Sequence, residues 1–552
     1  MKIKSISISA LIFLLSLSSF VFVSYTQNRD FQLSKNLEIY YSLFEELNTY
    51  YVDETDPSKL IKTSIDEMLK SLDPYTVYIP ESQMEDFRFM TTGQYGGIGA
   101  LIRKSGDYIV ITDPYENFPA HKAKLKAGDV IIEIDGKSIK GKNSSDVSSL
   151  LKGQPNTELE LTIKRPGVDK EFTRKLTREE IKLESVPYYG MINDKTGYIN
   201  LSSFTMNCGN DVKKALVELK EKHGMKNLIL DLRGNPGGLL IEAVNISGLF
   251  VKKGELIVST KGKVSEWDKS YYNMLNPVDE EIPLVVLVNS GSASASEIVS
   301  GAIQDLDRGV IVGQRTFGKG LVQTTRSLAY NSKLKVTTAK YYIPSGRCIQ
   351  ALDYTHRNDD GSVGKIPDSL ISEFKTKAGR LVYDGGGVTP DVTIPQTTLS
   401  SIAASLYFKN HIFDFATQYA ISKDSIDSPE KFTVSDEDYK TFIDFLQGKD
   451  FDYQTKSESD LDKLIETAKK EKYYNLSESE FGALKEKLAH DPQKDLNTFK
   501  NEITELLNEE IISRYYYQKG RLKMQLRNDP EVVEAVKIIE DKEKYKKILE
   551  VQ

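Results

Sequence analysis

The feature that most constrains this fold is an alternation of short apolar strands and helices between residues 185 and 395. The strand candidates are KTGYINL, NLILDL, PLVVLV, GVIVG and KVTTAKYY. Between them lie helix candidates at residues 210–223, 239–250 and 295–306. Such alternation predicts a βαβ core with a mostly parallel sheet. Several strands are nearly continuous Val, Ile and Leu, which indicates that helices cover both faces of the sheet.

Three other segments differ from this core in composition. Apolar residues recur at helical spacing before residue 90, whereas from Gln94 short β runs alternate with glycines. Beyond about Thr398 the chain is rich in Lys, Glu, Asp, Tyr and Leu and poor in Gly and Pro. The predicted domains are therefore an N-terminal helical segment at 28–90, a β-rich module at 91–180, the α/β core at 181–400 and a helical domain of unknown role at 401–552.

Residues 1–27 have the pattern of an export leader. Two lysines within Met1 to Lys4 precede an apolar and serine-rich run from Ala10 to Val23, and the first acidic residue is Asp30. A removed signal peptide and an uncleaved membrane anchor both remain open, because no A-x-A site follows and the uncharged run is long enough to span a bilayer. We expect an exported protein, periplasmic or otherwise extracytoplasmic, that touches the membrane only through this segment.

Composition excludes several classes of partner and cofactor. The 552 residues include 73 Lys and Arg against 80 Asp and Glu, so the chain lacks the basic excess expected of a nucleic-acid-binding protein. The five histidines form no metal-ligand spacing, and no nucleotide-binding glycine motif occurs. We therefore expect no metal and no cofactor. With only Cys208 and Cys348, a disulfide scaffold is excluded and a single bridge remains open.

A nucleophile candidate lies where the strand PLVVLV ends in the turn NSGSASASE. A small-residue turn at a helix start exposes a hydroxyl beside free backbone N–H groups, which suits Ser294, although a serine-rich turn is also a common helix cap. Lys319 lies between two glycines 25 residues later, and a lysine with little water around it can act as a general base. Gln323 follows four residues on and could orient the amine.

A third motif precedes both. The strand NLILDL runs into RGNPGG, where glycines allow close backbone approach to a substrate carbonyl. The ordered set DLRGNPGG, GSASASE and FGKGLVQ resembles the carboxyl-terminal processing proteases, which are serine proteases with a Ser-Lys dyad or Ser-Lys-Gln triad. The resemblance covers about residues 35–395 and implies a ClpP/crotonase-like core with an inserted PDZ domain. It also implies that Ser294 is the nucleophile, Lys319 the base and Gln323 its orienter, with Gly238 and Ala295 supplying oxyanion N–H groups.

The same resemblance gives the β-rich module a role. The run Gln94 to Gly99 lies where a PDZ domain binds a carboxylate, so Gly96, Gly97, Ile98 and Gly99 become candidate peptide-binding residues. A PDZ domain adds a C-terminal peptide as an extra strand and holds its last side chain in an apolar pocket. Val147 and Leu151, on the helix candidate SSDVSSLLKG, join Ile98 as the expected pocket residues.

The implied function is an exported serine endopeptidase that cleaves protein substrates near apolar C-terminal tails, with peptide binding to the PDZ domain assembling the dyad. A tail-binding scaffold on an inactive protease fold is the alternative, and an acyl-CoA enzyme of the crotonase type is a weaker one. The helical domain at 401–552 fits docking of an adaptor protein, capping of a substrate tunnel or dimerisation. The sequence leaves the oligomeric state undetermined.

Overall fold

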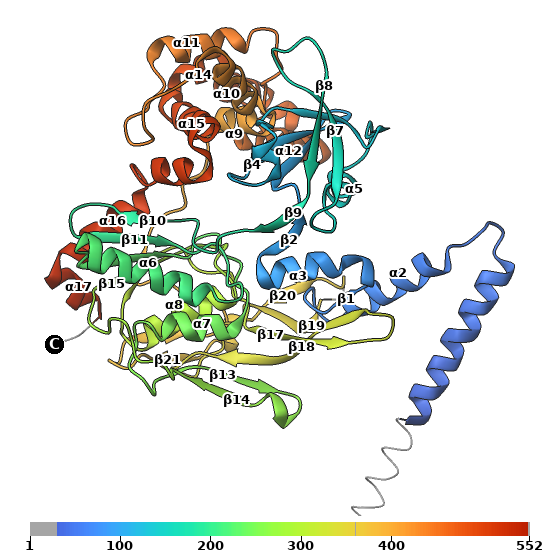
Figure 1. Ribbon diagram of the computed structural model, residues 1–552, viewed down its shortest axis with the longest axis vertical. Helices are drawn as coiled ribbons and strands as arrows, with labels where there is room; N and C mark the ends of the chain where they lie inside the picture. Colours follow the sequence, from blue (N-terminus) through green and yellow to red (C-terminus); the bar gives the residue numbers. More distant parts are fainter. Residues whose placement is uncertain (1–29, 359, 550–552) are drawn as a thin grey trace, which may run out of the picture. The chain divides into compact units, whose positions relative to one another are not determined.

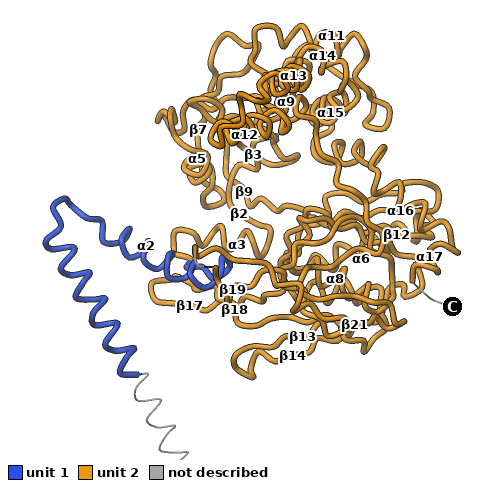
Figure 2. Tube along the Cα trace, turned by 180° about the vertical axis from the view of Figure 1, so that it is seen from behind, with its two compact units in different colours: residues 1–78 blue, residues 79–552 orange. Residues whose placement is uncertain are grey.

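The computed structural model describes residues 30–549 except residue 359. It divides into two units, residues 1–78 and 79–552 (Figure 2). The predicted leader at 1–27 lies outside the described residues. Within those described residues, no helix combines the length and the apolar character needed to cross a bilayer.

The described part of the first unit is mainly helical, as its apolar periodicity predicts. Residues 30–50 form one helix, and α2 (Pro57–Lys70) forms the next. The Asp56 carboxylate caps α2 by accepting from the N–H groups of Ser58 and Lys59, while proline at the first helical position needs no partner for its nitrogen. The helix ends shortly before Asp73-Pro74, in agreement with the expected stop.

The β-rich module is built on an antiparallel sheet, with its longer helix α5 at the side of the strands (Figure 1). Its order is β3-β4-β5-β7-β8, with α5 packed beside β3. A short pair, β2 with β9, leads the chain in and out of the module. The bounds are α3 (Met84–Thr92), β2 (Gln94–Gly97), β3 (Ala100–Ser105), β4 (Tyr108–Pro114), α4 (Pro119–Lys122), β5 (Val130–Ile134), β6 (Lys137–Ser138), α5 (Ser144–Leu151), β7 (Glu158–Lys164), β8 (Phe172–Thr177) and β9 (Glu179–Lys182).

The α/β core is built on a sheet of order β10-β11-β12-β15-β16-β23, in which every pair from β11 to β23 is parallel. The predicted mostly parallel sheet is thus confirmed. Helices α6, α7 and α8 cover one of its faces. The bounds are β10 (Tyr188–Met191), β11 (Thr196–Asn200), α6 (Cys208–His223), β12 (Asn227–Asp231), α7 (Leu240–Ser247), β15 (Leu284–Val288), α8 (Ala295–Asp305), β16 (Val310–Gly313) and β23 (Val392–Thr393).

The strand KVTTAKYY does not join the parallel sheet. As β18 (Lys333–Tyr342) it pairs antiparallel with β17 (Leu321–Ser327) and with β13 (Leu256–Gly262), which in turn pairs with β14 (Lys269–Tyr272). The reason is local: only a short turn separates β17 from β18, and antiparallel neighbours need no crossover helix. Short hairpins β19–β20 (Leu352–Arg357, Val363–Lys365) and β21–β22 (Glu373–Lys375, Leu381–Tyr383) follow.

The helices of the C-terminal domain pack against two different parts of the protein. Helices α9, α10, α11, α14 and α15 share a hydrophobic cluster of their own. This helical region contacts the β-rich module, for example where the Arg103 guanidinium lies 4.6 Å from the centre of the Phe413 ring. Helices α16 and α17 instead cover the second face of the parallel sheet. The bounds are α9 (Ser401–Phe408), α10 (His411–Ser422), α11 (Asp436–Phe445), α12 (Lys456–Lys470), α13 (Glu478–Leu488), α14 (Pro492–Thr498), α15 (Lys500–Gln525), α16 (Pro530–Glu540) and α17 (Lys542–Leu549).

Both cysteines are free thiols in the structure. Cys208 is buried at the start of α6, and burial together with the nearby Glu242 carboxylate raises the pKa of its thiol. Burial also raises the pKa of Cys348. The disulfide that the sequence left open is not formed.

Candidate active site

Ser294 lies in the turn that joins the buried strand β15 to helix α8. Its backbone has φ +55° and ψ −110°, a conformation that costs a non-glycine residue about 1–3 kcal/mol. Two contacts hold it there. The Ser294 N–H donates to Glu297 Oε2 at 2.8 Å, and the Tyr341 hydroxyl donates to the Ser294 carbonyl at 3.2 Å. The turn therefore has a fixed geometry at the helix N-terminus.

Glu297 is a fully buried carboxylate that joins this turn to the loop carrying Lys319. Its Oε1 accepts from the Thr316 hydroxyl at 2.6 Å and from the Gly318 N–H at 2.7 Å. Its Oε2 accepts from the Lys319 N–H at 2.9 Å as well as from Ser294. Burial raises the pKa of Glu297 while these donors oppose the rise. Four donors take up the acceptor sites of its two oxygens, an arrangement that suits the ionised carboxylate.

One cavity of about 630 Å³ brings most of the predicted catalytic residues together. Ser294, Lys319, Gln323 and Gly238 all line it, while Ala295 begins α8 directly beside it. The Gln323 amide donates to the Thr337 hydroxyl at 3.1 Å, across the β17–β18 hairpin. That bond engages the amide nitrogen and leaves the amide oxygen as the group able to accept from an amine.

The glycine turn after β12 lies against the Ser294 turn. A Cβ on Gly237 would approach the Ala293 carbonyl oxygen to 2.6 Å and the Ala295 nitrogen to 2.9 Å, so only glycine fits there. The Gly237 N–H is already bonded to Asn235 Oδ1 at 2.9 Å. In contrast, neither the Gly238 nor the Ala295 N–H donates to another described residue. These two donors, beside the Ser294 hydroxyl, are suited to hold an oxyanion.

A second groove, of about 390 Å³, lies between β3 and α5 of the β-rich module. Ile98 and Leu151 line it, as predicted, together with Ser144 and Ser148. The prediction of Val147 as a pocket residue needs correction: its side chain is fully buried in the core of the module and does not line the groove. Along α5, Ser144, Ser148 and Leu151 line the groove, whereas Val147 packs in the core of the module.

At the end of this groove, neighbouring atoms leave no room for a side chain at Gly96 or Gly97. A Cβ on Gly96 would lie 2.0 Å from the Gly153 carbonyl oxygen, and one on Gly97 would lie 2.8 Å from the Tyr95 ring. Gly99 has φ +70°. The N–H groups of Ile98 and Gly99 donate to no other residue in the described part of the chain. Successive N–H groups of this kind are what a peptide carboxylate needs.

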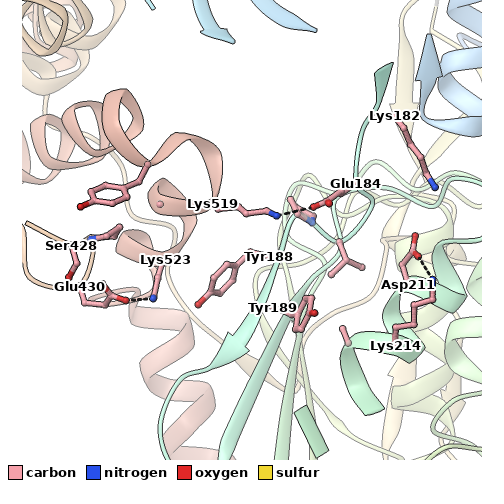
Figure 3. A pocket seen from close by; sticks show the side chains of 16 residues that line it. Lys182, Glu184, Tyr188, Tyr189, Asp211, Lys214, Ser428, Glu430, Lys519 and Lys523 are labelled. Carbon is pink, nitrogen blue, oxygen red and sulfur yellow. Dashed lines mark ion pairs between the residues drawn. The ribbon is translucent and has the colours of Figure 1, made fainter. Parts of the chain in front are cut away.

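A larger cavity, of about 900 Å³, contains none of the predicted site residues (Figure 3). It lies between β10, α6 and α15, and six of its seven Lys, Asp and Glu side chains form ion pairs with one another, Lys182 being the seventh. Lys519 lies 3.5 Å from Glu184, Lys214 lies 3.7 Å from Asp211, and Lys523 pairs with Glu430. Since these pairs leave no cluster of like charges or nucleophilic groups facing the opening, we assign no chemistry to this cavity.

Sequence reasoning missed Glu297, Thr316 and Tyr341. The signal for Glu297 was present, because Ser294-Ala295-Ser296-Glu297 has the spacing of a capping box. That pattern usually marks a helix start only. Nothing in the sequence connected Thr316 or Tyr341 with Ser294.

Comparison with known proteins identifies the family. The profile of peptidase family S41 matches residues 195–356, that of the PDZ domain residues 110–165, and that of a "probable PDZ-protease, C-terminal helical domain" residues 402–539. A carboxy-terminal-processing protease of Bartonella bacilliformis is 40% identical over 335 residues, which are 60% of this chain and 76% of that protein. A probable CtpA-like serine protease of Staphylococcus aureus is 39% identical over 57% of this chain and 62% of its own length.

Among solved structures, the photosystem II D1 C-terminal processing protease matches 64% of this chain and 91% of its own, with 31% identity and a TM-score of 0.35. The identity to the Bartonella protein, over three quarters of that protein's length, decides the assignment. The chain belongs to the carboxy-terminal-processing proteases of peptidase family S41 and is a serine-type peptidase.

Proposed function

We propose that this protein is an exported endopeptidase that cleaves protein substrates near their C-termini with Ser294 and Lys319. The observation that carries the proposal is the single cavity lined by Ser294, Lys319, Gln323 and Gly238. In a scaffold that only captures tails, nothing would require a strained serine, a lysine and a glutamine to line the same cavity.

The reaction follows acyl-transfer chemistry. Lys319, neutral, takes the hydroxyl proton of Ser294 as the oxygen attacks the substrate carbonyl. The negative oxygen of the tetrahedral intermediate accepts from the N–H groups of Gly238 and Ala295. Lys319 then returns the proton to the leaving amine, and the C–N bond breaks. Water attacks the acyl-enzyme by the same route and regenerates Ser294. Gln323 orients the Lys319 amine through its amide oxygen.

The PDZ domain recruits the substrate. We propose that an apolar C-terminal residue enters the groove near Ile98 and Leu151, while the N–H groups of Ile98 and Gly99, which follow Gly97, hold the carboxylate. Gly96 shapes this loop by its close approach to Gly153. Substrates with apolar C-terminal tails are therefore the expected partners, and residues 1–27 direct the chain to an extracytoplasmic site.

The test combines cleavage with covalent labelling. The chain from Gln27 onward is expected to cleave an unfolded reporter that has an apolar C-terminus, in EDTA as well as without it. The Ser294→Ala and Lys319→Ala variants are expected to lose cleavage, and a fluorophosphonate should label the unaltered protein but not Ser294→Ala. Binding of the reporter without cleavage or labelling would instead favour the scaffold function.

Substrate recruitment by the PDZ domain can be tested with a matched pair of variants on α5. Ser148 lines the groove, whereas its exposed neighbour Ser149 does not. We expect Ser148→Glu to weaken binding of an apolar-ended peptide about tenfold or more, because the added carboxylate repels the peptide terminus and occupies the groove. Ser149→Glu should change the affinity less than about twofold. Fluorescence anisotropy in a Ser294→Ala background measures both, and equal affinities would place the peptide elsewhere.

A further inference from the structure

Lys335 is a cation in the active-site cavity that the reaction described above does not use. It lines the cavity from β18, where it lies opposite Thr325 of β17. Two residues further along β18 is Thr337, opposite Gln323. Since alternate residues of a strand share a face, Lys335 lies on the same face as the bond between Gln323 and Thr337.

The ammonium of Lys335 has no counter-charge in the described part of the protein. It forms no hydrogen bond or ion pair with any residue that the structure describes. Among the described residues that line the cavity, Glu184 carries the one carboxylate, and that carboxylate pairs with Lys519 at 3.5 Å. Burial lowers the pKa of Lys335. A half-buried ammonium without a partner is costly, and a carboxylate placed beside it would remove that cost.

The spacing of the strand limits where such a carboxylate can lie. Lys335 is two residues from Thr337, which is about 7 Å along an extended strand. The lysine side chain can add several ångströms in either direction. We take the scissile bond to lie beside Gln323, as the proposed reaction requires. Because an extended substrate spans about 3.4 Å per residue, we infer that the ammonium reaches groups about two to four residues from that bond.

We propose that Lys335 binds a substrate carboxylate a few residues from the scissile bond and thereby selects where the enzyme cuts. This inference rests on the proposed function of the same cavity. The chemistry fits two sources, the terminal carboxylate of a short departing C-terminal segment and an acidic side chain within the same distance. A short leaving segment that ends beside Lys335 would make the enzyme trim close to a chain end, after the PDZ domain has released or passed on the terminus.

The experiment compares the unaltered protein and three variants on matched pairs of charged and uncharged peptides. Peptides with one scissile bond carry two, three or four residues beyond it and end in a free carboxylate or an amide. A second amidated set carries Glu or Gln at those positions. Each set is cleaved by the unaltered protein, Lys335→Met and Lys335→Arg, with Lys340→Met as the control, because Lys340 is an exposed lysine of the same strand. The PDZ domain contributes equally to all of these proteins and cancels from the comparison.

We expect the unaltered enzyme to prefer the charged peptide of each pair by about tenfold to a hundredfold in kcat/KM, as for a hydrogen bond to a charged group. Lys335→Met should lose the preference, and Lys335→Arg should keep most of it. A preference within the first set identifies the terminal carboxylate as the group that Lys335 binds, and a preference within the second set identifies a Glu side chain. Equal losses on charged and uncharged peptides, or a preference that survives Lys335→Met, would overturn the proposal.

Peptide affinity in a Ser294→Ala background gives the same comparison without catalysis. There, a preference for the charged peptide that depends on Lys335 supports the inference even where cleavage fails. A preference that differs by less than about twofold between the protein with Lys335 and its Lys335→Met variant refutes it. Fluorophosphonate labelling of Ser294 in the Lys335→Met protein reports separately on the proposed function, since it needs no carboxylate.

Discussion

Replacing Glu297 with alanine is expected to lower kcat/KM by about a thousandfold or more, although Glu297 does not line the substrate cavity. The substitution removes the acceptor of the Ser294, Gly318 and Lys319 N–H groups and of the Thr316 hydroxyl. Each buried donor left without a partner costs about 1–3 kcal/mol. The Ser294 turn and the Lys319 loop then lose their shared anchor, and a displacement near 1 Å can cost about a hundredfold in rate.

Glu297→Gln separates the charge from the shape. The amide keeps the size of the side chain, but its NH₂ group faces donors, so we expect an intermediate loss of about a hundredfold. Glu221→Gln, on an exposed part of α6, is the matched control and should leave the rate unchanged. Peptide cleavage and the rate of fluorophosphonate labelling measure the effect. Full activity of Glu297→Gln would show that the carboxylate does not position the two loops.

The same residue illustrates how far the sequence predicts the site. Ser294, Lys319 and Gln323 can be identified because each lies in a short motif next to a predicted strand or helix. Glu297 also lies in a motif, but the capping box has an ordinary structural explanation that hides its second role. Thr316 and Tyr341 lie 19 and 47 residues from their partners, and such pairings depend on the packing of β18 and the loop after β16.

The tail shows a similar limit at the level of the fold. Its composition, rich in Lys, Glu, Asp, Tyr and Leu and poor in Gly and Pro, predicts helices, and helices form. The pattern does not reveal what an apolar helix face covers. The strands of the parallel sheet indicate what these helices cover, because a sheet with apolar residues on both faces needs helices on both faces. Helices α6 to α8 supply one layer, and α16 and α17 supply the other.

The link between α16 and the catalytic core is also ionic. Arg233, at the start of the glycine turn, lies 2.6 Å from Asp231 and 2.7 Å from Asp529, and it also pairs with Glu531. Asp529 additionally caps α16. The first turn of α16 is therefore tied to the strand end that leads into the glycine turn, so the C-terminal helices are part of the α/β core and not an appendage to it.

Two adjacent valines on α16 test this role with the same substitution. Val532 is 1% exposed and packs in the cluster that covers β12, β15 and β16, whereas Val533 is 41% exposed. Val532→Asp buries a carboxylate between the helix and the sheet, which costs several kcal/mol, so we expect the midpoint of thermal unfolding to fall by about 10 °C or more. Val533→Asp should stay within about 0.5 kcal/mol of the unaltered protein.

Thermal unfolding followed by circular dichroism, in a Ser294→Ala background that prevents self-cleavage, distinguishes the two valine variants. We expect the two variants to differ in stability because the second face of the sheet is apolar. Ile229 and Leu287 on that face would lie in water once α16 detaches. Detachment exposes that face and frees Arg233 from two of its three carboxylates. Val532→Asp should therefore lose peptide cleavage in the Ser294 protein along with stability. Equal midpoints for the two variants would mean that the parallel sheet is stable without α16.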